Sequence, residues 1–323
     1  MDMQASKSDH SLPTGRAGVG AMHYRLLRLF WHALSLLPLG FHYVLSDLLL
    51  YPFVYYLLRY RRTLVRRQLA ESLPLQSEAE RRATERRFYH FFCDYLVETV
   101  KMMTISEREM RRRVEWVGLE HLQQRMSAHD HYFAFVYLGH LGNWEWMASF
   151  PLHLQPDFLG AQIYHPLRNR NMDSLFLSVR SRFGGSCIPM KETLRHLLAL
   201  RRQGRRQVVG FIADQSPKWE AMHQWCRFLS HDTSFFVGAE RLGKRLGAEM
   251  WYVDVTRPRR GYYRAELRFL ADASASVPDF QLTDLYARLL ERSIQSNPHL
   301  WLWTHNRWKR TREEWKKRNK QKE

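Results

Sequence analysis

Cysteine is scarce in this sequence. The 323 residues include only three, Cys93, Cys187 and Cys226, and these lie far apart along the chain. Zinc and redox sites use pairs of cysteines about two to four residues apart, and no such pair exists. We therefore expect no metal site and no disulfide framework, which favours the reducing, cytoplasmic side of a membrane. No motif surrounds Cys187 or Cys226, so we expect both thiols to be inert.

Several short motifs that carry chemistry are also missing. The chain has no Gly-x-Ser-x-Gly of a serine hydrolase and no His-Glu-x-x-His of a zinc peptidase. It has no glycine-rich phosphate loop of either common type. These absences argue against a serine hydrolase, a zinc peptidase and a nucleotide-dependent enzyme, and we expect no cofactor.

Acidic residues are outnumbered by basic ones. The sequence has 50 Lys and Arg against 32 Asp and Glu, a formal net charge of +18, and 14% of its residues are aromatic. This balance favours an acidic partner, which is a nucleic acid, an anionic membrane surface or an acidic protein. Because no motif that reads DNA or RNA accompanies the charge, we predict that nucleic acid is not the partner.

A long stretch without Lys or Arg lies near the amino terminus. Residues 1–22 are polar and small, and we predict a disordered leader there. Residues 23–58 are mostly apolar, with no Lys or Arg between Arg28 and Arg59. About 20 apolar residues suffice to cross a bilayer, so this segment is predicted to be a helical membrane anchor.

The predicted anchor is interrupted by two prolines, a glycine and a carboxylate, Pro38, Gly40, Asp47 and Pro52. It is consistent with one crossing, a re-entrant pair, a broken helix in the interface, or a buried hairpin of a soluble core. Five arginines follow it directly: Arg59, Arg61, Arg62, Arg66 and Arg67. Arginines beside an apolar anchor stay on the cytoplasmic side and attract anionic lipid, so we expect an anionic membrane surface as a partner.

The rest of the chain alternates between strand and helix patterns. Strands are predicted at 114–118, 132–138, 157–164, 206–214, 248–257 and 262–270, and helices at 77–104, 143–154, 172–183, 191–203, 237–247 and 281–296. This alternation predicts an α/β domain over residues 59–306, with a largely parallel central sheet flanked by helices. Residues 307–323 are predicted to form a basic tail, with Trp308 and Trp315 among its Lys and Arg.

The clearest candidate for chemistry is the turn GHLGNWE, which follows the apolar run YFAFVYL. His140 and Glu145 would point about 140° apart on one helix. They can meet if His140 lies in a turn made by Gly139 and Gly142, and Glu145 in the first turn of a helix capped by Asn143. The carboxylate would then hold one imidazole nitrogen and leave the other as a base.

The position of this turn supports a functional role, because open α/β sheets bind ligands at the carboxyl ends of their strands. The alternative is a capped turn that contains a structural histidine. The chain has 16 histidines, so chance pairings with carboxylates are common. Geometry alone does not separate the two interpretations.

The block GHLGNWEW resembles the His-x4-Asp/Glu block of the glycerolipid acyltransferases, and most closely the late acyltransferases of lipid A synthesis. Further segments resemble that branch in order and spacing: RRTLVRRQLAESLP, WVGLEHL, YHPLRNRNMDSLFLSVRSRFG, FIADQSP and NPHLWLWTHNRWK. The resemblance implies that His140 is the general base and Glu145 its orienting partner. It also places Arg180 and Asp214 in the active-site cleft.

The same blocks supply the remaining candidates for substrate binding. These are Asn143, His165, Arg168 and Gln215. His165 stands where many relatives carry arginine, which leaves open the anionic group that this loop reads. Arg180 is expected to bind substrate phosphate or the developing oxyanion, and Asp214 to cap a turn or serve the site; an ion pair between them would satisfy both roles.

The resemblance implies a membrane-bound O-acyltransferase on the cytoplasmic face of the inner membrane of a Gram-negative bacterium. Acyl carrier protein is the expected acyl donor, and a lipid A precursor is the expected acceptor. A lysophospholipid or an acyl-amino-acid lipid would need the same base and the same anchor. A non-enzymatic protein that binds membrane or nucleic acid is the alternative from a different class.

Overall fold

The computed structural model describes residues 17–273 and 276–320. Most of the predicted leader, residues 1–16, lies outside the described residues. Its last residues do not form a disordered segment, because helix α1 (Ala17–Leu36) already begins at Ala17. Helix α1 therefore begins inside the predicted leader.

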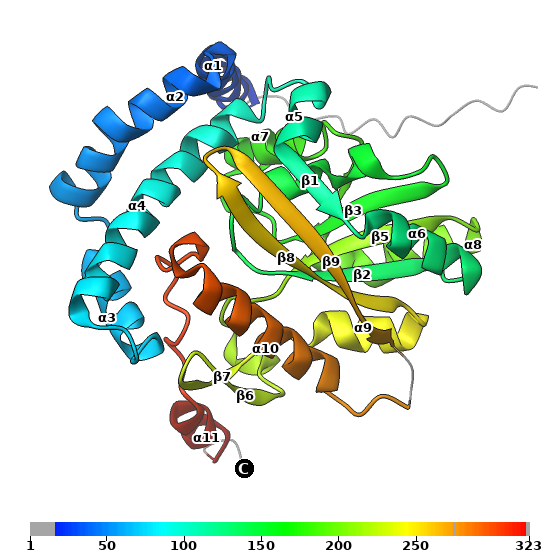
Figure 1. Ribbon diagram of the computed structural model, residues 1–323. Coiled ribbons are helices and arrows are strands. Elements are labelled where there is room, and N and C mark those ends of the chain that lie inside the picture. Colours follow the sequence, from blue (N-terminus) through cyan, green and yellow to red (C-terminus); the bar gives the residue numbers. More distant parts are fainter. Residues whose placement is uncertain (1–16, 274–275, 321–323) are drawn as a thin grey trace, which may run out of the picture.

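A seven-stranded sheet forms the centre of the molecule, in the order β1-β9-β8-β2-β5-β3-β4 (Figure 1). Its strands are β1 (Val114–Val117), β2 (Phe133–Leu138), β3 (Phe158–Tyr164), β4 (Ser186–Pro189), β5 (Arg206–Ile212), β8 (Glu249–Arg259) and β9 (Tyr262–Asp272). Only β8 and β9 pair antiparallel; the other neighbours are parallel. The prediction of an α/β fold with a largely parallel sheet is confirmed.

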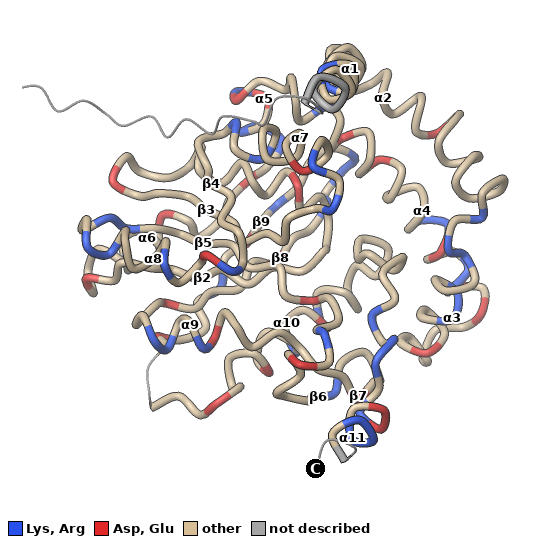
Figure 2. Tube along the Cα trace, turned by 180° about the vertical axis from the view of Figure 1, so that it is seen from behind, with Lys and Arg blue, Asp and Glu red and all other residues tan. Residues whose placement is uncertain are grey.

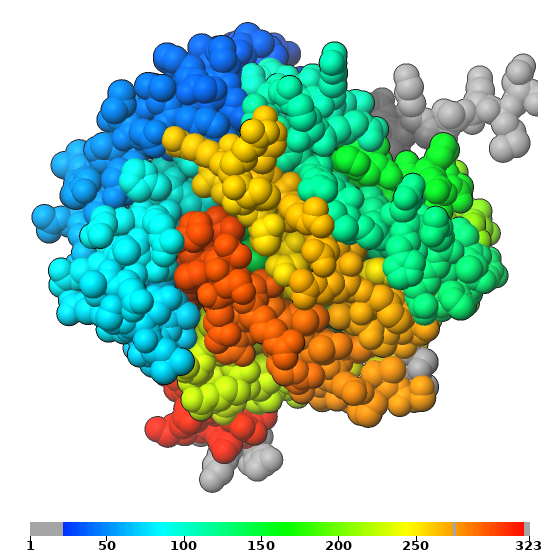
Figure 3. All heavy atoms as spheres, in the orientation of Figure 1, coloured from blue at the N-terminus to red at the C-terminus, as the bar shows by residue number. Residues whose placement is uncertain are grey.

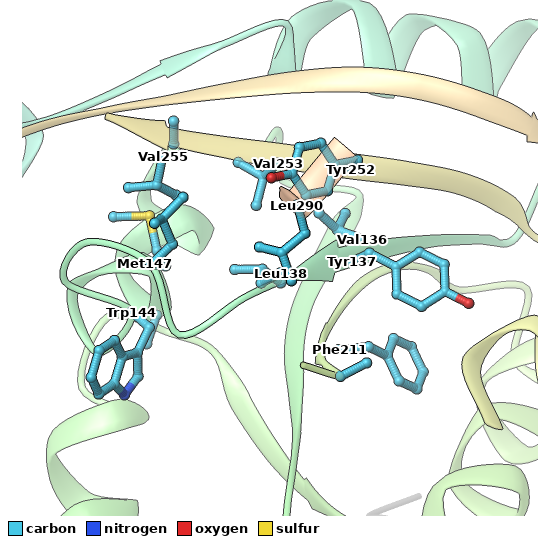
Figure 4. Close-up of a cluster of buried hydrophobic side chains, with 14 of the residues drawn as sticks. Val136, Tyr137, Leu138, Trp144, Met147, Phe211, Tyr252, Val253, Val255 and Leu290 are labelled. Atoms are coloured by element: carbon cyan, nitrogen blue, oxygen red, sulfur yellow. The ribbon is translucent and has the colours of Figure 1, made fainter. Parts of the chain in front are cut away.

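Strand β2 lies in the middle of this sheet because its sequence, FAFVYL, is apolar on both faces. It pairs in parallel with β5 on one side and β8 on the other, and all six residues are buried. One face packs against α10 (Gln281–Ser296), whose Leu290 lies beside Leu138 and Tyr252 in the core (Figure 4). A strand buried on both faces reads as a continuous apolar run, as this one does.

Helices cover both faces and one flank of the sheet. Their bounds are α3 (Arg62–Ser72), α4 (Glu78–Lys101), α5 (Glu107–Arg113), α6 (Leu119–Ala128), α7 (Arg170–Arg180), α8 (Thr193–Arg202), α9 (Gly238–Leu246) and α11 (Arg312–Lys320). Helix α4 starts at a capping box, in which Ser77 and Glu80 each bond the other's backbone N–H. It runs between the amino-terminal helices and the sheet (Figure 1).

Two local predictions differ from the structure. The helix predicted over 143–154 is a 3-10 helix, Trp146–His153, with Pro151 inside it; proline has no N–H for an α-helical bond. A small hairpin, β6 (Trp225–Phe228) and β7 (His231–Ser234), was not predicted. Its turn residues Leu229 and Ser230 have φ of 48° and 67°, and neither is a residue that normally marks such a turn.

The amino-terminal apolar segment forms a bent pair of helices. After α1 come α2 (Leu39–Leu45) and two π-helical stretches, Ser46–Leu50 and Pro52–Leu57. Among the described residues no single helix is long and apolar enough to cross a membrane, but Met22–Leu36 and Leu39–Leu57 together are, with a bend of 105° at the break. We refer to residues 22–57 as the anchor.

One side of the anchor is packed and the other is uncovered. Leu39, Tyr51, Val54 and Tyr55 are buried with the core. The uncovered side carries a continuous set of large apolar side chains that includes Leu26, Leu29, Phe30, Leu36, Phe41, Val44, Leu48, Leu49, Phe53 and Leu57. In Figure 3 the anchor forms a band along one edge of the molecule. A patch of this extent marks a surface for a membrane or a partner.

The predicted basic tail is part of the fold at its start. Arg307 is buried, and its guanidinium donates to Thr233 Oγ1 at 2.8 Å and to the Ser234 carbonyl at 2.7 Å. Trp308 stacks on His231 with ring centroids 4.1 Å apart. The assignment of Arg307 and Trp308 to a tail is therefore wrong, because hairpin β6–β7 receives both side chains.

Candidate active site

The turn after β2 is shaped by two glycines. A Cβ on Gly139 would lie 2.5 Å from Leu290 Cδ1, and one on Gly142 would lie 2.7 Å from Val255 Cγ1. Gly142 also has φ +65°, where side chains are strained. The turn is tied to a later segment by two bonds, from Gly142 N–H to the Leu300 carbonyl (3.0 Å) and from Leu302 N–H to the His140 carbonyl (3.1 Å).

His140 pairs with Asp214, at the end of the neighbouring strand β5. Its Nδ1 lies 2.6 Å from Asp214 Oδ1, and its backbone N–H donates to Oδ2 at 2.9 Å. Trp301 Nε1 donates to the same Oδ2 at 2.8 Å. Burial acts to raise the pKa of Asp214, but the charge of His140 and these hydrogen bonds outweigh it and lower the pKa to about 2.

The predicted contact between Glu145 and His140 is therefore wrong. Asp214 pairs with His140 and Arg180 with Glu145, so the ion pair that would have satisfied both roles of Arg180 and Asp214 does not form. The carboxylate that holds His140 comes from a residue 74 positions further along the chain. Asp214 reaches His140 because β2 and β5 are parallel neighbours, with Leu138 opposite Ile212. Their carboxyl ends bring the two turns to one edge of the sheet.

The second imidazole nitrogen has a different environment. His140 Nε2 lies 3.2 Å from the side-chain amide of Gln215, and the His140 side chain keeps 17% of its surface exposed. An ionised Asp214 accepts only, so Nδ1 carries a proton, and in the neutral imidazole the lone pair is on Nε2. The Nε2 side of the ring is therefore faced by a neutral amide, whereas the Nδ1 side is held by a carboxylate.

Glu145 instead holds Arg180. Arg180 Nε donates to Oε2 at 2.7 Å and Nη2 donates to Oε1 at 2.6 Å, while the Glu145 side chain is only 4% exposed. Burial acts to lower the pKa of Arg180, but the Glu145 bonds and charge outweigh it and raise the pKa above its ordinary value. A bidentate pair of this kind fixes the plane of the guanidinium.

An aromatic pair links the two ion pairs. The Trp144 ring meets the His140 ring edge-on, with centroids 5.0 Å apart, and stacks on Tyr95 of α4 at 4.1 Å. Burial and the nearby charge of Glu145 raise the pKa of Tyr95. Figure 4 shows Trp144 in the turn region after β2, as one of the buried hydrophobic side chains of the core.

The cap position of the 3-10 helix Trp146–His153 is Glu145 and not Asn143 as predicted, but the Asn143 Oδ1 does accept from the Trp146 N–H at 3.1 Å. Its Nδ2 donates to Glu98 Oε2 of α4 at 2.8 Å. The residue is fully buried. Both ends of its amide are engaged within the protein, so its position argues against contact with substrate.

His165 and Arg168 lie on the loop after β3. Both are exposed, and His165 Nδ1 lies 3.0 Å from the neighbouring Pro166 carbonyl. Because β3 neighbours β5 in parallel, this loop leaves the sheet at the same edge as His140. Within the described part of the chain, no hydrogen bond or ion pair connects either residue to His140.

Sequence reasoning missed the contributions of Trp301, Trp144 and His305. The first two are described above. Burial lowers the pKa of His305 to about 4, and its Nε2 accepts from the Ser216 N–H at 3.4 Å. The blocks NWEW and NPHLWLWTHN contain these residues, but only the fold shows that Trp144 contacts His140 and that Trp301 bonds Asp214.

A cluster of His131, Glu249 and Asp272 brings three potential metal ligands within 4.8 Å of one another. It lies at the other end of β2 and β8, and Arg125 already pairs with Glu249 at 3.2 Å and Asp272 at 2.9 Å. A guanidinium between the carboxylates occupies the place of a cation.

The cysteines offer no nucleophile either, since burial raises the pKa of Cys226 to about 11.

Comparison with known families gives one result. Residues 21–310 match the family model described as bacterial lipid A biosynthesis acyltransferase, so the match covers the anchor, the sheet and the segment of Trp301. No curated protein shows significant sequence similarity to the chain.

Proposed function

Because the chain belongs to the bacterial lipid A biosynthesis acyltransferase family, we propose that it transfers a fatty acyl group from acyl carrier protein to a hydroxyl of a lipid A precursor, with His140 as the general base. Family membership gives the enzyme class, an acyl donor and a lipid A precursor. The observation that carries the assignment of the base is the short contact between His140 Nδ1 and Asp214.

In the proposed reaction, His140 Nε2 takes the proton from the acceptor hydroxyl as its oxygen attacks the thioester carbonyl. The hydroxyl replaces the Gln215 amide as the partner of Nε2. Asp214 stays ionised and stabilises the imidazolium, because its pKa is about 2. When the tetrahedral intermediate collapses, the C–S bond breaks and His140 returns the proton to the leaving thiolate.

Arg180 is the proposed ligand for negative charge in this reaction. Its Nε and Nη2 are held by Glu145, which leaves Nη1 for an oxyanion or a substrate phosphate. Preorganised donors lower the barrier because they need no rearrangement as charge develops. Glu145 then acts through Arg180 as a positioning residue.

The membrane and the donor fit the same scheme. The family is membrane-associated, and the uncovered apolar side of the anchor supplies the contact. The net charge of +18 suits both anionic lipid and acyl carrier protein, which is acidic. We propose that the enzyme works at the cytoplasmic face of the inner membrane, where that carrier and the reducing environment are found.

The decisive experiment is acyl transfer by detergent-solubilised protein, with acyl carrier protein and coenzyme A thioesters as alternative donors. The acceptors are a tetra-acylated lipid A precursor and a panel of lysolipids. His140→Ala is expected to lower the rate on the lipid A precursor by about 10²–10⁴-fold. Removal of residues 312–323 serves as the control, and is expected to leave the rate within about threefold, because α11 holds none of the proposed catalytic groups.

Three outcomes contradict the proposal in different ways. Transfer to a lysolipid alone overturns the acceptor and keeps the base. Transfer only from coenzyme A overturns the donor. If folded His140→Ala protein is as active as wild type while loss of residues 312–323 abolishes function, a binding protein without this chemistry becomes the better description.

A further inference from the structure

A cavity of about 240 Å³ lies between the first helix of the anchor and α7. Its lining residues come from three elements: Arg28 and His32 of α1, Met103 just after α4, and Ser178, Val179 and Arg182 of α7 and the turn that follows it. The helices are in contact beside it, because the Trp31 ring meets the Phe176 ring edge-on at 6.0 Å. Figure 1 shows α7 below α1 at the end of α4.

The polar lining of this cavity is cationic and largely without partners. In the described ranges, no hydrogen bond or ion pair engages the side chains of Arg28, His32 or Ser178. Arg182 uses only Nη1, which donates to the Met102 carbonyl at 2.9 Å and to the Ile105 carbonyl at 2.5 Å. No carboxylate lines the cavity, so its charged lining groups are the guanidinium groups of Arg28 and Arg182, and the Ser178 hydroxyl can also donate to an anion.

The position of the two residues on α1 gives the cavity its relation to the membrane. Arg28 and His32 are four residues apart and share one face of the helix. With 100° per residue, that face lies between the packed side, which carries Trp31 and Ser35, and the uncovered side. Leu29, on the uncovered side, is 65% exposed. If the uncovered side enters lipid, Arg28 and His32 would lie at its border, where headgroups are found.

We propose that this cavity binds the phosphate of an anionic membrane lipid headgroup. Basic pockets beside membrane helices on the cytoplasmic side bind such headgroups. The volume is below the roughly 300–1,000 Å³ of sites for drug-sized molecules. It is large enough for a phosphate and several waters, each of which takes about 30 Å³. The acyl chains of the lipid would lie along the uncovered side of α1.

Such a lipid would act on the candidate active site through α7. Ser178 is two residues from Arg180, whose guanidinium lies 5.0 Å from the Phe176 ring centroid and binds Glu145. A phosphate shared by α1 and α7 would hold these helices together and keep Arg180 in place. This site is separate from the acyl-transfer proposal, since none of its lining residues is assigned a role there and its occupancy is measured without acyl transfer.

The test is binding of short-chain lipids to the full-length protein in neutral detergent, measured by isothermal titration calorimetry below their micelle concentrations. The ligands are dihexanoyl phosphatidylglycerol, dihexanoyl phosphatidylcholine and inorganic phosphate. Arg28→Gln removes one cation from the cavity. Ser178→Leu fills the cavity without a change of charge. Arg25→Gln is the matched control, because Arg25 is an exposed arginine on the same helix that does not line the cavity.

The expected result is one saturable site for phosphatidylglycerol and none for phosphatidylcholine. Arg28→Gln and Ser178→Leu should each raise the Kd for phosphatidylglycerol about fivefold or more. This is the change expected for the loss of one basic contact to an anionic lipid. Arg25→Gln should leave the Kd for phosphatidylglycerol within about twofold of the wild-type value. Thermal unfolding confirms that each variant is folded.

Other outcomes overturn the proposal. Equal losses for Arg25→Gln and Arg28→Gln would mean general attraction by surface charge. Binding that survives both Arg28→Gln and Ser178→Leu would place the lipid elsewhere. Inorganic phosphate that binds as tightly as phosphatidylglycerol, with the same sensitivity to Arg28→Gln, would assign the cavity to free phosphate instead of a headgroup.

Discussion

At the scale of single residues, the two nitrogens of His140 are distinguished by their partners. Asp214 takes the Nδ1 side at 2.6 Å, and only a neutral amide faces Nε2. Asp214→Asn should therefore lower kcat by about 10²–10⁴-fold, because the amide favours the wrong tautomer and no longer stabilises the imidazolium. Steady-state acyl transfer measures this, and an Asp214→Asn enzyme with unchanged kcat would remove Asp214 from the mechanism.

The depressed pKa of Asp214 also predicts how stability depends on pH. Its folded pKa is about 2 against 3.8 for a free aspartate, so its contribution is present above about pH 4 and is lost as pH falls toward 2. The difference corresponds to about 2–3 kcal/mol. Thermal unfolding of wild type and Asp214→Asn should differ most above pH 4 and converge as the pH approaches 2. A constant gap across this range would contradict the assignment.

Glu145 and Arg180 should behave as one unit. If Glu145 acts by holding Arg180, then Glu145→Gln, Arg180→Gln and the double variant should lower kcat/KM by similar factors, because the second change has little left to remove. The control is the pair Glu145→Gln and Asp214→Asn, which belong to different ion pairs. If the losses of kcat/KM from Glu145→Gln and Arg180→Gln add up in the double variant, Glu145 acts independently of Arg180.

At the scale of elements, α4 connects the anchor to the turn that carries His140. Toward the anchor, Asp94 accepts from Ser46 Oγ at 2.9 Å and from Arg257 at 2.6 Å, and Arg260 pairs with both Asp94 and Asp47. One helical turn later, Glu98 accepts from Tyr43, Asn143 and Tyr263. The anchor and the turn thus share one buried network on α4.

Removal of one charge from this network should cost more than removal of a similar charge at the surface. Asp94→Asn leaves Arg257 and Arg260 short of a buried partner, and should lower the free energy of unfolding by about 3 kcal/mol or more. Asp254→Asn breaks only the pair with Arg268, which is 47% exposed, and should cost less than about 1 kcal/mol. Unfolding in urea measures both, and equal losses would contradict the role of the network.

At the scale of the whole molecule, the anchor is part of the folded unit. Its residues Leu39, Tyr51 and Val54 belong to the core, and its polar groups complete the network on α4. A chain that lacks residues 1–58 should therefore aggregate or unfold, whereas loss of residues 312–323 should leave a folded protein. Size-exclusion chromatography in detergent tests this, and a monodisperse, active protein without residues 1–58 would show that the anchor is only an attachment.

The predictions from sequence were accurate where a pattern was local. The run FAFVYL predicts a buried strand, and Gly139 and Gly142 predict the turn, because each rests on the backbone preferences of a few adjacent residues. The predicted partner of His140 was wrong because the prediction relied on closeness in sequence. Glu145 is near His140 along the chain, whereas Asp214 comes near it only when β2 and β5 pair. Hairpin β6–β7 was missed because Leu229 and Ser230 give no turn signal.

The sequence by itself determined the fold class, the apolar anchor and the histidine of the candidate site, since periodicity, composition and short motifs are properties of neighbouring residues. The tertiary structure alone decided which carboxylate holds His140, which arginine Glu145 holds, and that Arg307 is buried. Those choices depend on strand order and helix packing, which bring together side chains as far apart as Ser46 and Arg260. No local pattern encodes such distances, because they follow from the burial of the whole sheet.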